Sequence, residues 1–337
     1  MNVISKLSPK DYASDQDLRW CPGCGDYAIL KAVQKTFADL AVDPANAVFI
    51  SGIGCAARFP YYMATYGFHT IHGRAAAIAT GAKMANPDLD IWVVAGDGDS
   101  LSIGGNHLLH LLRRNVDLVY LMFNNEIYGL TKGQASPTSR RGTRSPTTPS
   151  GSRDEPVHAA RFALGASASF VARAVDVNQK HLVETLKRAH AHEGVAFVEI
   201  LQNCIVFNDG VYASVSDKKQ GPEHALELVH GQPMIWGANR DKGLIFDLET
   251  MSLKAVLVGN GGVAEADILI HDETNRTLAG MLSVIDGEPG MPTPIGVLYA
   301  RPAATFDTGK PADTAAPDEV RKRIGSLLHS GHTWNVI

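Results

Sequence analysis

Apolar positions in the first 205 residues follow two patterns, which alternate along the chain. In one pattern, apolar residues recur every three or four positions, as on the buried face of a helix. In the other, short apolar runs indicate strands that are buried on both faces. The helical pattern covers residues 27–40, 74–85, 108–114 and 181–191, and the runs are 47–51, 91–95, 117–123, 170–174 and 195–201. This alternation predicts an α/β fold, in which helices flank a parallel sheet.

A glycine-rich or polar cluster follows four of these runs. Gly52-Ile53-Gly54-Cys55 follows the first run, Gly96-Asp97-Gly98 the second, Asn124-Asn125 the third and Gln202-Asn203-Cys204 the last. The carboxyl ends of parallel strands meet at one edge of a sheet, and ligands of open α/β sheets bind at that edge. We therefore expect the functional site among these clusters.

The rest of the chain is less regular. Residues 136–156 are rich in Ser, Thr, Pro, Gly and Arg. Composition alone favours a flexible linker, but long loops inside compact domains are often lids or binding loops, and we expect this loop to lie against a partner or over the site. Beyond Cys204 the pattern predicts only short strands at 255–258, 268–270 and 295–298 and a helix at 318–328, so we expect the α/β core to close near Cys204.

Composition narrows the class of protein. The 337 residues are 45% hydrophobic and 20% charged, as in ordinary globular proteins. The net charge of −4 and the lack of a basic stripe argue against nucleic-acid binding, and no run approaches the roughly 20 apolar residues that span a bilayer. The polar N-terminus is unlike a signal peptide, and the 4 cysteines are too few for a disulfide scaffold, so we expect a cytoplasmic protein.

Asp97 and Asn125 form the first candidate site. Gly98 and Asn124 are separated by 25 residues, enough for one helix and one strand, so we expect Asp97 and Asn125 at the ends of neighbouring parallel strands. Carboxylate and amide oxygens suit a hard divalent cation such as Mg²⁺, and the glycines let backbone N–H groups approach a diphosphate. Either motif alone is better explained as a turn or a strand-end cap. The combination indicates a metal site.

The four cysteines form the second candidate site. Cys21 and Cys24 make a Cys-x-x-Cys motif, and Cys55 and Cys204 each follow a predicted strand. Such a motif brings two thiolates to one metal centre, and two further cysteines would complete a tetrahedral set. A thioredoxin-like redox pair is disfavoured because its motif normally follows a strand. Spacing alone does not separate an iron–sulfur cluster from structural zinc.

Gly-Asp-Gly, 25 residues and then Asn-Asn resembles the thiamine-diphosphate fingerprint. The resemblance implies an Mg²⁺ ion held by Asp97, Asn125 and the backbone carbonyl of Ile127. Joined to the four cysteines in this order, the fingerprint resembles the β subunit of 2-oxoacid:ferredoxin oxidoreductases, and this implies that the cysteines bind one [4Fe–4S] cluster. The resemblance covers about residues 17–300, and residues 128–138 are most similar to the 2-oxoglutarate branch.

The same resemblance guides the assignment of cofactor and substrate contacts. We expect residues near the predicted strand ends to hold thiamine diphosphate, and His72 and Arg74 among them to donate charge-assisted hydrogen bonds to its diphosphate. The expected contacts are Ile53, Gly54, Cys55, Ala56, His72, Arg74, Gly98, Asp99, Gly129 and Leu130. Lys132, in a glycine-flanked segment, is the candidate for binding the distal carboxylate of the substrate; the alternative is a solvated surface lysine.

The resemblance also implies a fold, a reaction and partners. We expect a thiamine-diphosphate-binding fold with an N-terminal cluster-binding segment (1–25), an α/β domain (26–210) and a C-terminal extension (211–337) that packs on the core and on a partner subunit. The reaction would be oxidative decarboxylation of 2-oxoglutarate with coenzyme A to succinyl-CoA and CO₂, or its reverse, with electrons passing to ferredoxin. A separate α subunit would grip the aminopyrimidine of thiamine, in an (αβ)₂ assembly.

Three alternatives differ in substrate, metal or function. The first keeps the class of enzyme and changes the substrate to pyruvate or a broad set of 2-oxoacids. The second is half of a non-redox thiamine enzyme whose four cysteines hold structural zinc. The third is a metal-stabilised scaffold without catalysis, and the intact pair Asp97 and Asn125 argues against it.

Overall fold

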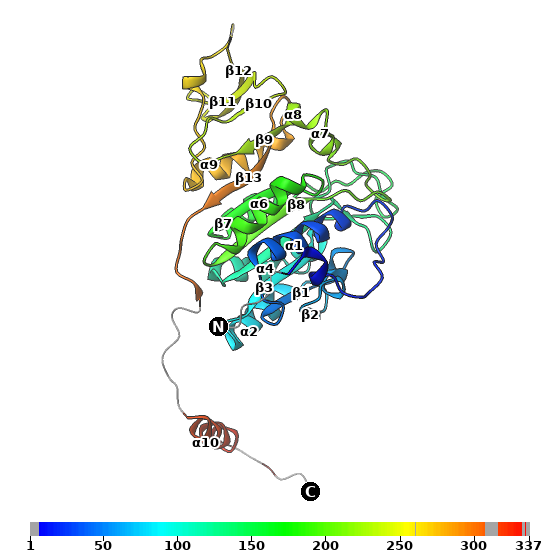
Figure 1. Ribbon diagram of the computed structural model, residues 1–337, viewed down its shortest axis with the longest axis vertical. Helices are drawn as coiled ribbons and strands as arrows, with labels where there is room; N and C mark the ends of the chain where they lie inside the picture. The colour runs from blue at the N-terminus through cyan, green and yellow to red at the C-terminus, as the bar shows by residue number, and fades with distance from the viewer. Residues whose placement is uncertain (1–6, 260, 307–315, 332–333, 335–337) are drawn as a thin grey trace.

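The computed structural model describes residues 7–259, 261–306, 316–331 and 334, and its centre is an eight-stranded sheet (Figure 1). The only antiparallel neighbours in this sheet are β7 and β13. From edge to edge the strands are β2 (Tyr66–His69), β1 (Ala47–Ser51), β3 (Asp90–Gly96), β4 (Leu118–Asn124), β8 (Val195–Leu201), β7 (Phe170–Val175), β13 (Thr293–Ala300) and β9 (Ala225–Leu228). The predicted α/β class, with a parallel sheet between helices, is confirmed.

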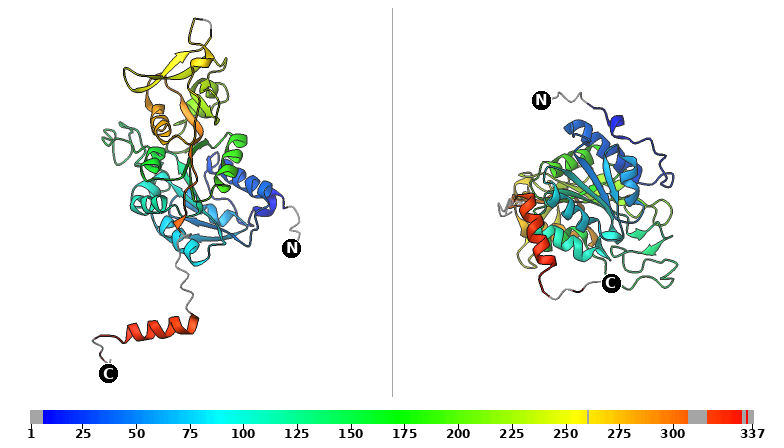
Figure 2. Two further views of the ribbon diagram at one scale, coloured as in Figure 1. Left: turned by 90° about the vertical axis from the view of Figure 1, so that its left-hand side faces the viewer. Right: turned by 90° about the horizontal axis from the view of Figure 1, so that it is seen from below.

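Helices cover both faces of the sheet (Figures 1 and 2). One face packs against α1 (Asp26–Leu40) and α6 (Gln179–His190), and the other against α2 (Ala75–Ala85), α4 (Gly105–Arg114), α5 (Ala159–Gly165) and α9 (Arg276–Leu282). Successive side chains of a strand point to opposite faces of the sheet. In β3, Trp92 and Val94 pack in the hydrophobic core on one face, and Ile91 and Val93 pack in the core on the other. Strands buried on both faces explain the unbroken apolar runs of the sequence.

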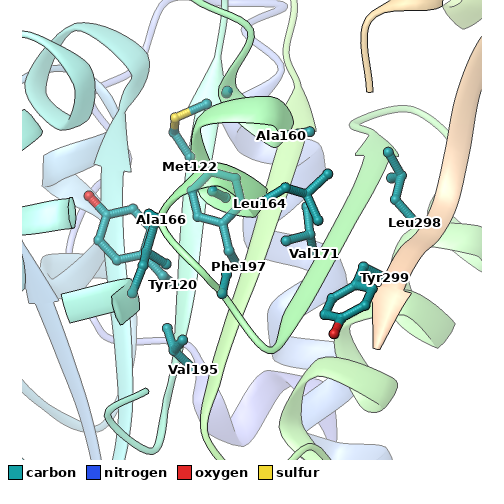
Figure 3. Packing of buried hydrophobic residues seen from close by; sticks show 14 of the residues in the cluster. Tyr120, Met122, Ala160, Leu164, Ala166, Val171, Val195, Phe197, Leu298 and Tyr299 are labelled. Atoms are coloured by element: carbon teal, nitrogen blue, oxygen red, sulfur yellow. The ribbon is translucent and has the colours of Figure 1, made fainter. Parts of the chain in front are cut away.

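Figure 3 shows part of the core between the sheet and α5. Tyr120 of β4 and Phe197 of β8 stack with their ring centroids 5.9 Å apart. Leu164 of α5 and Val171 of β7 belong to the same cluster. Close packing of this kind holds the strand ends in fixed positions, and those ends carry the candidate site.

The prediction that the α/β core closes near Cys204 is wrong. Strands β9 and β13, which follow Cys204 by more than twenty residues, extend the central sheet beyond β7. All but the end residues of β13 are buried. Without β13, the backbone groups along that side of β7 would lack strand partners. The segment assigned to a C-terminal extension therefore contributes two strands to the central sheet.

The remaining C-terminal residues form a small antiparallel sheet. It contains β10 (Ile235–Trp236), β11 (Lys242–Asp247) and β12 (Ser252–Leu257), and β12 covers most of the predicted strand at 255–258. The predicted strand at 268–270 is wrong, because only Ile270 forms an isolated bridge, with Pro233. The predicted helix at 318–328 is α10 (Pro317–Leu328).

Shorter elements connect these parts. They are η1 (Pro9–Tyr12), η2 (Ala56–Tyr62), α3 (Asp97–Leu101), β5 (Ile127–Tyr128), β6 (Gln134–Ala135), α7 (Ala213–Ser216), α8 (Gly221–His224), η3 (Glu265–Asp267) and η4 (Ile285–Gly287). Within the described residues, no helix combines the length and the apolar character needed to cross a membrane.

Candidate functional site

Asp97 and Asn125 follow neighbouring strands, as predicted. Asp97 comes directly after β3, Asn125 directly after β4, and these two strands pair in parallel. Asp97 is 2% exposed and begins the short helix α3. Glu126 adopts a left-handed conformation (φ 54°), which turns the chain sharply after β4. Asn125, Ile127 and Asp97 all line one pocket at this edge of the sheet.

Two hydroxyl groups hold the Asp97 carboxylate. Oδ2 of Asp97 accepts hydrogen bonds from Ser136 Oγ at 2.5 Å and from Thr138 Oγ1 at 2.6 Å. Burial raises the pKa of Asp97, and the two hydroxyl donors oppose this shift. A buried carboxylate with only neutral partners of this kind suits a divalent cation, which would compensate the remaining charge.

Asp99 organises the two turns that flank the pocket. Its Oδ1 accepts from the backbone N–H groups of Ile53 (3.1 Å) and Gly73 (2.8 Å), and His72 Nδ1 lies 2.5 Å from the same oxygen. The turn after β1 approaches the carboxylate so closely that a Cβ on Gly52 would lie 1.9 Å from Oδ2. Asp99 therefore fixes the backbone of both turns, in addition to lining the pocket.

Nearly all of the predicted thiamine contacts line this pocket. Gly54 has a φ of +134°, and a Cβ at its position would meet no atom within 4 Å, so the backbone faces open space there. Arg74 is directed elsewhere, since its guanidinium donates to the carbonyl oxygens of His72 (3.3 Å) and Ile103 (3.4 Å). The predicted contacts that line the pocket are Ile53, Gly54, Cys55, Ala56, His72, Gly98, Asp99, Gly129 and Leu130.

All four cysteines line a second cavity, next to the first. A Cβ on Gly129 would lie 3.5 Å from Cys204 Sγ and 3.6 Å from Cys55 Sγ, so these two sulfur atoms flank the glycine backbone. Burial raises the pKa of the Cys24 thiol and, to about 12, that of Cys55, with Asp26 as the next cause for each. A bound metal centre would reverse these shifts, because coordinated thiols are deprotonated.

Two kinds of metal centre fit four cysteines. Four thiolates around one zinc ion lie about 3.8 Å from one another, because Zn–S bonds are about 2.3 Å long. Across the residues that the structure describes, no three Cys, His, Asp or Glu side chains converge to hold a single ion. The four cysteines line one cavity, where a zinc ion or an iron–sulfur cluster would be held between them.

The two cavities share part of their walls. Both are lined by Cys55, Asn125, Gly129, Leu130 and Gln202. Cys55, which is expected both as a thiamine contact and as a metal ligand, is one of the shared residues. The two cavities are therefore direct neighbours.

Lys132 lies at the second cavity. It is exposed, has a φ of 77° and lines the wall with the cysteines, together with Arg19 and Arg58. Leu130, two residues earlier, lines both cavities. The assignment of Lys132 to the distal carboxylate of the substrate stays a prediction.

Several residues at the site were given no individual role in the sequence analysis, although Gln202 belongs to one of the clusters in which the site was expected. Gln202 lines both cavities and donates from Nε2 to Cys24 Sγ at 3.4 Å. Its position directly after β8 was an available signal. Asp26 is 1% exposed and lines the first pocket, and burial raises its pKa to about 7. Tyr128 fills the space beside Gly98, where it donates to the glycine carbonyl at 3.2 Å.

Comparison with known proteins agrees with this geometry. Residues 52–200 match the family described as "Thiamine pyrophosphate enzyme, C-terminal TPP binding domain". This segment begins in the turn after β1 and ends in β8, so it contains Asp97, Asn125 and the walls they contribute to the first pocket.

Relatives match either nearly the whole chain or a little more than half of it. The 2-oxoglutarate oxidoreductase subunit KorB of Mycobacterium tuberculosis is 45% identical, over 97% of this chain and 88% of the relative. The 2-oxoacid:ferredoxin oxidoreductase 1, subunit beta, of Aeropyrum pernix is 50% identical over 56% of this chain and 60% of that subunit.

A solved structure shares the fold. It is the 2-oxoglutarate:ferredoxin oxidoreductase from Magnetococcus marinus with 2-oxoglutarate, coenzyme A and succinyl-CoA bound. The TM-score is 0.74 at 34% sequence identity, covering 96% of this chain and 93% of that chain. Together with the relatives and the site, this shows that the chain belongs to the β-subunit family of the 2-oxoacid:ferredoxin oxidoreductases.

Proposed function

We propose that this chain is the thiamine- and cluster-binding subunit of a 2-oxoglutarate:ferredoxin oxidoreductase. The reaction is the oxidative decarboxylation of 2-oxoglutarate with coenzyme A to succinyl-CoA and CO₂, or its reverse. The observation that carries the proposal is the wall shared by the two cavities, one with Asp97 and Asn125 and the other with all four cysteines. This wall brings a thiamine site next to an electron acceptor.

Residues of the first pocket would hold thiamine diphosphate through Mg²⁺. Asp97, the side chain of Asn125 and the carbonyl of Ile127 supply the oxygen ligands that Mg²⁺ prefers. The open turn at Gly54 and the imidazole of His72 face the space left for the diphosphate. Thiamine diphosphate, when bound, supplies a carbanion that adds to the 2-keto carbon and stabilises the product of decarboxylation.

The cysteines would bind one [4Fe–4S] cluster. Cys21 and Cys24 come from the N-terminal segment, Cys55 from the turn after β1 and Cys204 from the segment after β8. Cys21 is exposed, and the neighbouring apolar side chains of Ile205, Val206 and Phe207 are 40–55% exposed. Electrons reach the surface most directly here, and Arg19 and Arg58 on the same wall suit an acidic ferredoxin.

The choice of 2-oxoglutarate rests on the relatives. The M. tuberculosis relative is named for 2-oxoglutarate, and the M. marinus structure contains 2-oxoglutarate and succinyl-CoA. A dicarboxylic substrate needs a cation for its distal carboxylate, and we assign this role to Lys132 in this chain. Its exposed side chain follows directly after the segment that lines both cavities.

A separate α subunit would complete the active site. The edge strand β2 is exposed along its length, and Tyr66, Phe68 and Ile71 at this edge are 53–68% exposed. Large exposed apolar side chains of this kind mark a protein interface. His72, which lines the thiamine pocket, follows Ile71 directly. We therefore place the α subunit over this edge. The proposed assembly is a cytoplasmic (αβ)₂ complex in which the C-terminal segment also contacts the partner.

Anaerobic purification of the chain with its co-expressed α subunit tests the proposal. We expect about four iron and four acid-labile sulfide per chain, as for one [4Fe–4S] cluster, with one thiamine diphosphate. Stoichiometric zinc without iron would contradict the redox function. Cys204→Ser should remove electron transfer to ferredoxin and leave thiamine diphosphate binding largely intact, because Cys204 lines only the cysteine cavity.

A further inference from the structure

Two charged residues lie in the middle of the central sheet. All of β8 is buried, and its residues are apolar except Glu199, which is 2% exposed. Arg173 of β7 is equally buried and pairs in register with Glu199, with Nε 2.8 Å from Oε2. Buried ion pairs of this kind are often no more stable than apolar residues of similar size. Fold stability alone therefore does not explain them.

The second oxygen of Glu199 contacts the strand that leads to the metal site. Oε1 accepts a hydrogen bond from Asn124 Nδ2 at 2.8 Å. A carboxylate paired with a guanidinium only accepts hydrogen bonds, so this contact sets the orientation of the Asn124 amide. The amide oxygen then faces Thr138, whose Oγ1 lies 2.9 Å away.

Thr138 continues the chain of contacts to Asp97. Its single hydroxyl lies between two acceptors, Asn124 Oδ1 and Asp97 Oδ2. Thr138 is 5% exposed, and its one hydroxyl proton can be donated to only one of these acceptors at a time, so the hydroxyl links the Asn124 amide to the Asp97 carboxylate by contact with both. With Ser136 on the same carboxylate oxygen, Oδ2 of Asp97 is held by two donors, which restricts rotation of the carboxylate.

We propose that Arg173, Glu199 and Asn124 are positioning residues for the metal ligand Asp97. They act through Thr138, and Asn124 also precedes the second side-chain ligand, Asn125. The inference rests on the proposed function, because it requires that Asp97 bind Mg²⁺ with thiamine diphosphate. Outer contacts of metal ligands commonly set their orientation and the affinity for the metal.

The far end of this chain of contacts involves the C-terminal segment. Arg173 Nη1 lies 3.5 Å from Asp286 Oδ2 in η4, and that carboxylate is partly exposed. Asp286 and Glu199 both raise the pKa of Arg173, against the effect of burial, so the guanidinium stays charged. Residues close to 286 are thereby linked to Asp97 through an unbroken series of polar contacts across β7, β8 and β4.

The decisive measurement is the Mg²⁺ concentration for half-maximal binding of thiamine diphosphate to the purified apo complex, by titration calorimetry. Thr138→Val keeps the shape and removes the hydroxyl, so the half-maximal concentration should rise by about tenfold or more. Thr138→Ser should restore it. Thr185→Val is the matched control, because this buried hydroxyl bonds only within α6, to the His181 carbonyl at 2.9 Å.

The ion pair is tested by the double variant Arg173→Met and Glu199→Leu. We expect the apo complex to keep its melting temperature, since no unpaired charge is left buried, and the Mg²⁺ requirement to rise as for Thr138→Val. If the double variant does not fold, Glu199→Gln replaces it as the test. The glutamine amide both donates and accepts hydrogen bonds, so it no longer fixes the orientation of the Asn124 amide, and the Mg²⁺ requirement should again rise.

Wild-type Mg²⁺ dependence in Thr138→Val and in the Glu199 variants would overturn the inference and leave the proposed function intact. Failure of the wild-type complex itself to bind thiamine diphosphate with Mg²⁺ would overturn both.

Discussion

Asp97 and Asp99 are both nearly fully buried, yet they are compensated in different ways. Asp99 accepts from two backbone N–H groups and lies beside His72, so its charge is largely satisfied by the protein. Asp97 accepts from two hydroxyls on one oxygen and from the backbone N–H groups of Asp97 and Gly98, but among the residues that the structure describes it has no basic side chain beside it, as Asp99 has in His72. Burial raises the pKa of each carboxyl group. Of the two, Asp97 has the greater need of a cation, and Asp99 serves the backbone around the pocket.

Asp97→Asn tests this distinction. Asparagine accepts from both hydroxyls through its Oδ1, so the fold should persist, but the charge that attracts Mg²⁺ is lost. We expect Mg²⁺-dependent binding of thiamine diphosphate, measured by calorimetry, to weaken by about a hundredfold or more. Asp88→Asn, at an exposed site, is the control. Equal cofactor content in wild type and Asp97→Asn would show the Gly-Asp-Gly segment to be an ordinary turn.

The proposed role of Lys132 in the choice of substrate can also be tested with a single substitution. A site built to pair an ion rejects ligands that leave the ion unpaired. Lys132→Met should therefore lower kcat/KM for 2-oxoglutarate by about ten- to a hundredfold, equivalent to about 1.4 to 2.8 kcal/mol, with much less effect on pyruvate. Steady-state kinetics on both substrates measure this. Equal losses on the two substrates would assign Lys132 to the cysteine cavity, whose wall it lines.

At the scale of elements, the sequence predicted those parts whose pattern is local. The runs at 91–95 and 117–123 are strands because a strand buried on both faces is apolar throughout. The addition of β13 to β7 was missed, since it depends on pairing across more than one hundred residues. The contacts of Ser136 and Thr138 with Asp97 were missed for the same reason, because they join residues about forty positions apart that share no periodic pattern.

The loop at residues 136–156 is only in part the flexible linker that its composition favours. Its first residues are buried, with Ser136 and Thr138 hydrogen-bonded to Asp97 and Ser139 to the Glu126 carbonyl, which contradicts a simple linker. Arg140 pairs with Glu126 at 3.1 Å, and Arg141 pairs with Glu155 within the loop. The rest of the loop is largely exposed. The loop is thus fixed at its beginning and presents an arginine-rich surface beyond it.

This surface should be covered by the α subunit. Arg141, Arg144 and Arg153 are exposed in the single chain, so trypsin should cut after them. In the complex with the α subunit we expect cleavage in this loop to slow by about tenfold or more, because these arginines are exposed in the single chain and would be covered by the partner. Mass spectrometry of the fragments over time measures the rates. Equal rates with and without the α subunit would mean that the loop lies outside the interface.

The first pocket, the cysteine cavity and the exposed edge at β2 occupy different parts of the molecule. The first pocket lies at the carboxyl ends of β3 and β4, and the cysteine cavity adjoins it. The exposed edge at β2 borders the first pocket, whereas Arg19 and the exposed segment Ile205–Phe207 border the second. Under the proposed function, the α subunit would cover the thiamine side, and the side with the cysteines, where we propose the cluster, would stay accessible to an electron carrier.

Accessibility of the cluster side predicts a charge-dependent reaction with ferredoxin. Arg19 is exposed and pairs only at the surface, with Asp17 at 3.1 Å, so reversing its charge should leave the fold unchanged. Arg19→Glu should lower kcat/KM for an acidic ferredoxin by about tenfold at low ionic strength, and added salt should narrow the difference because it screens exposed charges. Lys31→Glu makes the same charge change at an exposed position of α1 and is the control. Methyl viologen needs no protein docking, so its reduction should fall much less. An equal loss with both acceptors would mean that Arg19 affects the cluster itself and that ferredoxin docks elsewhere.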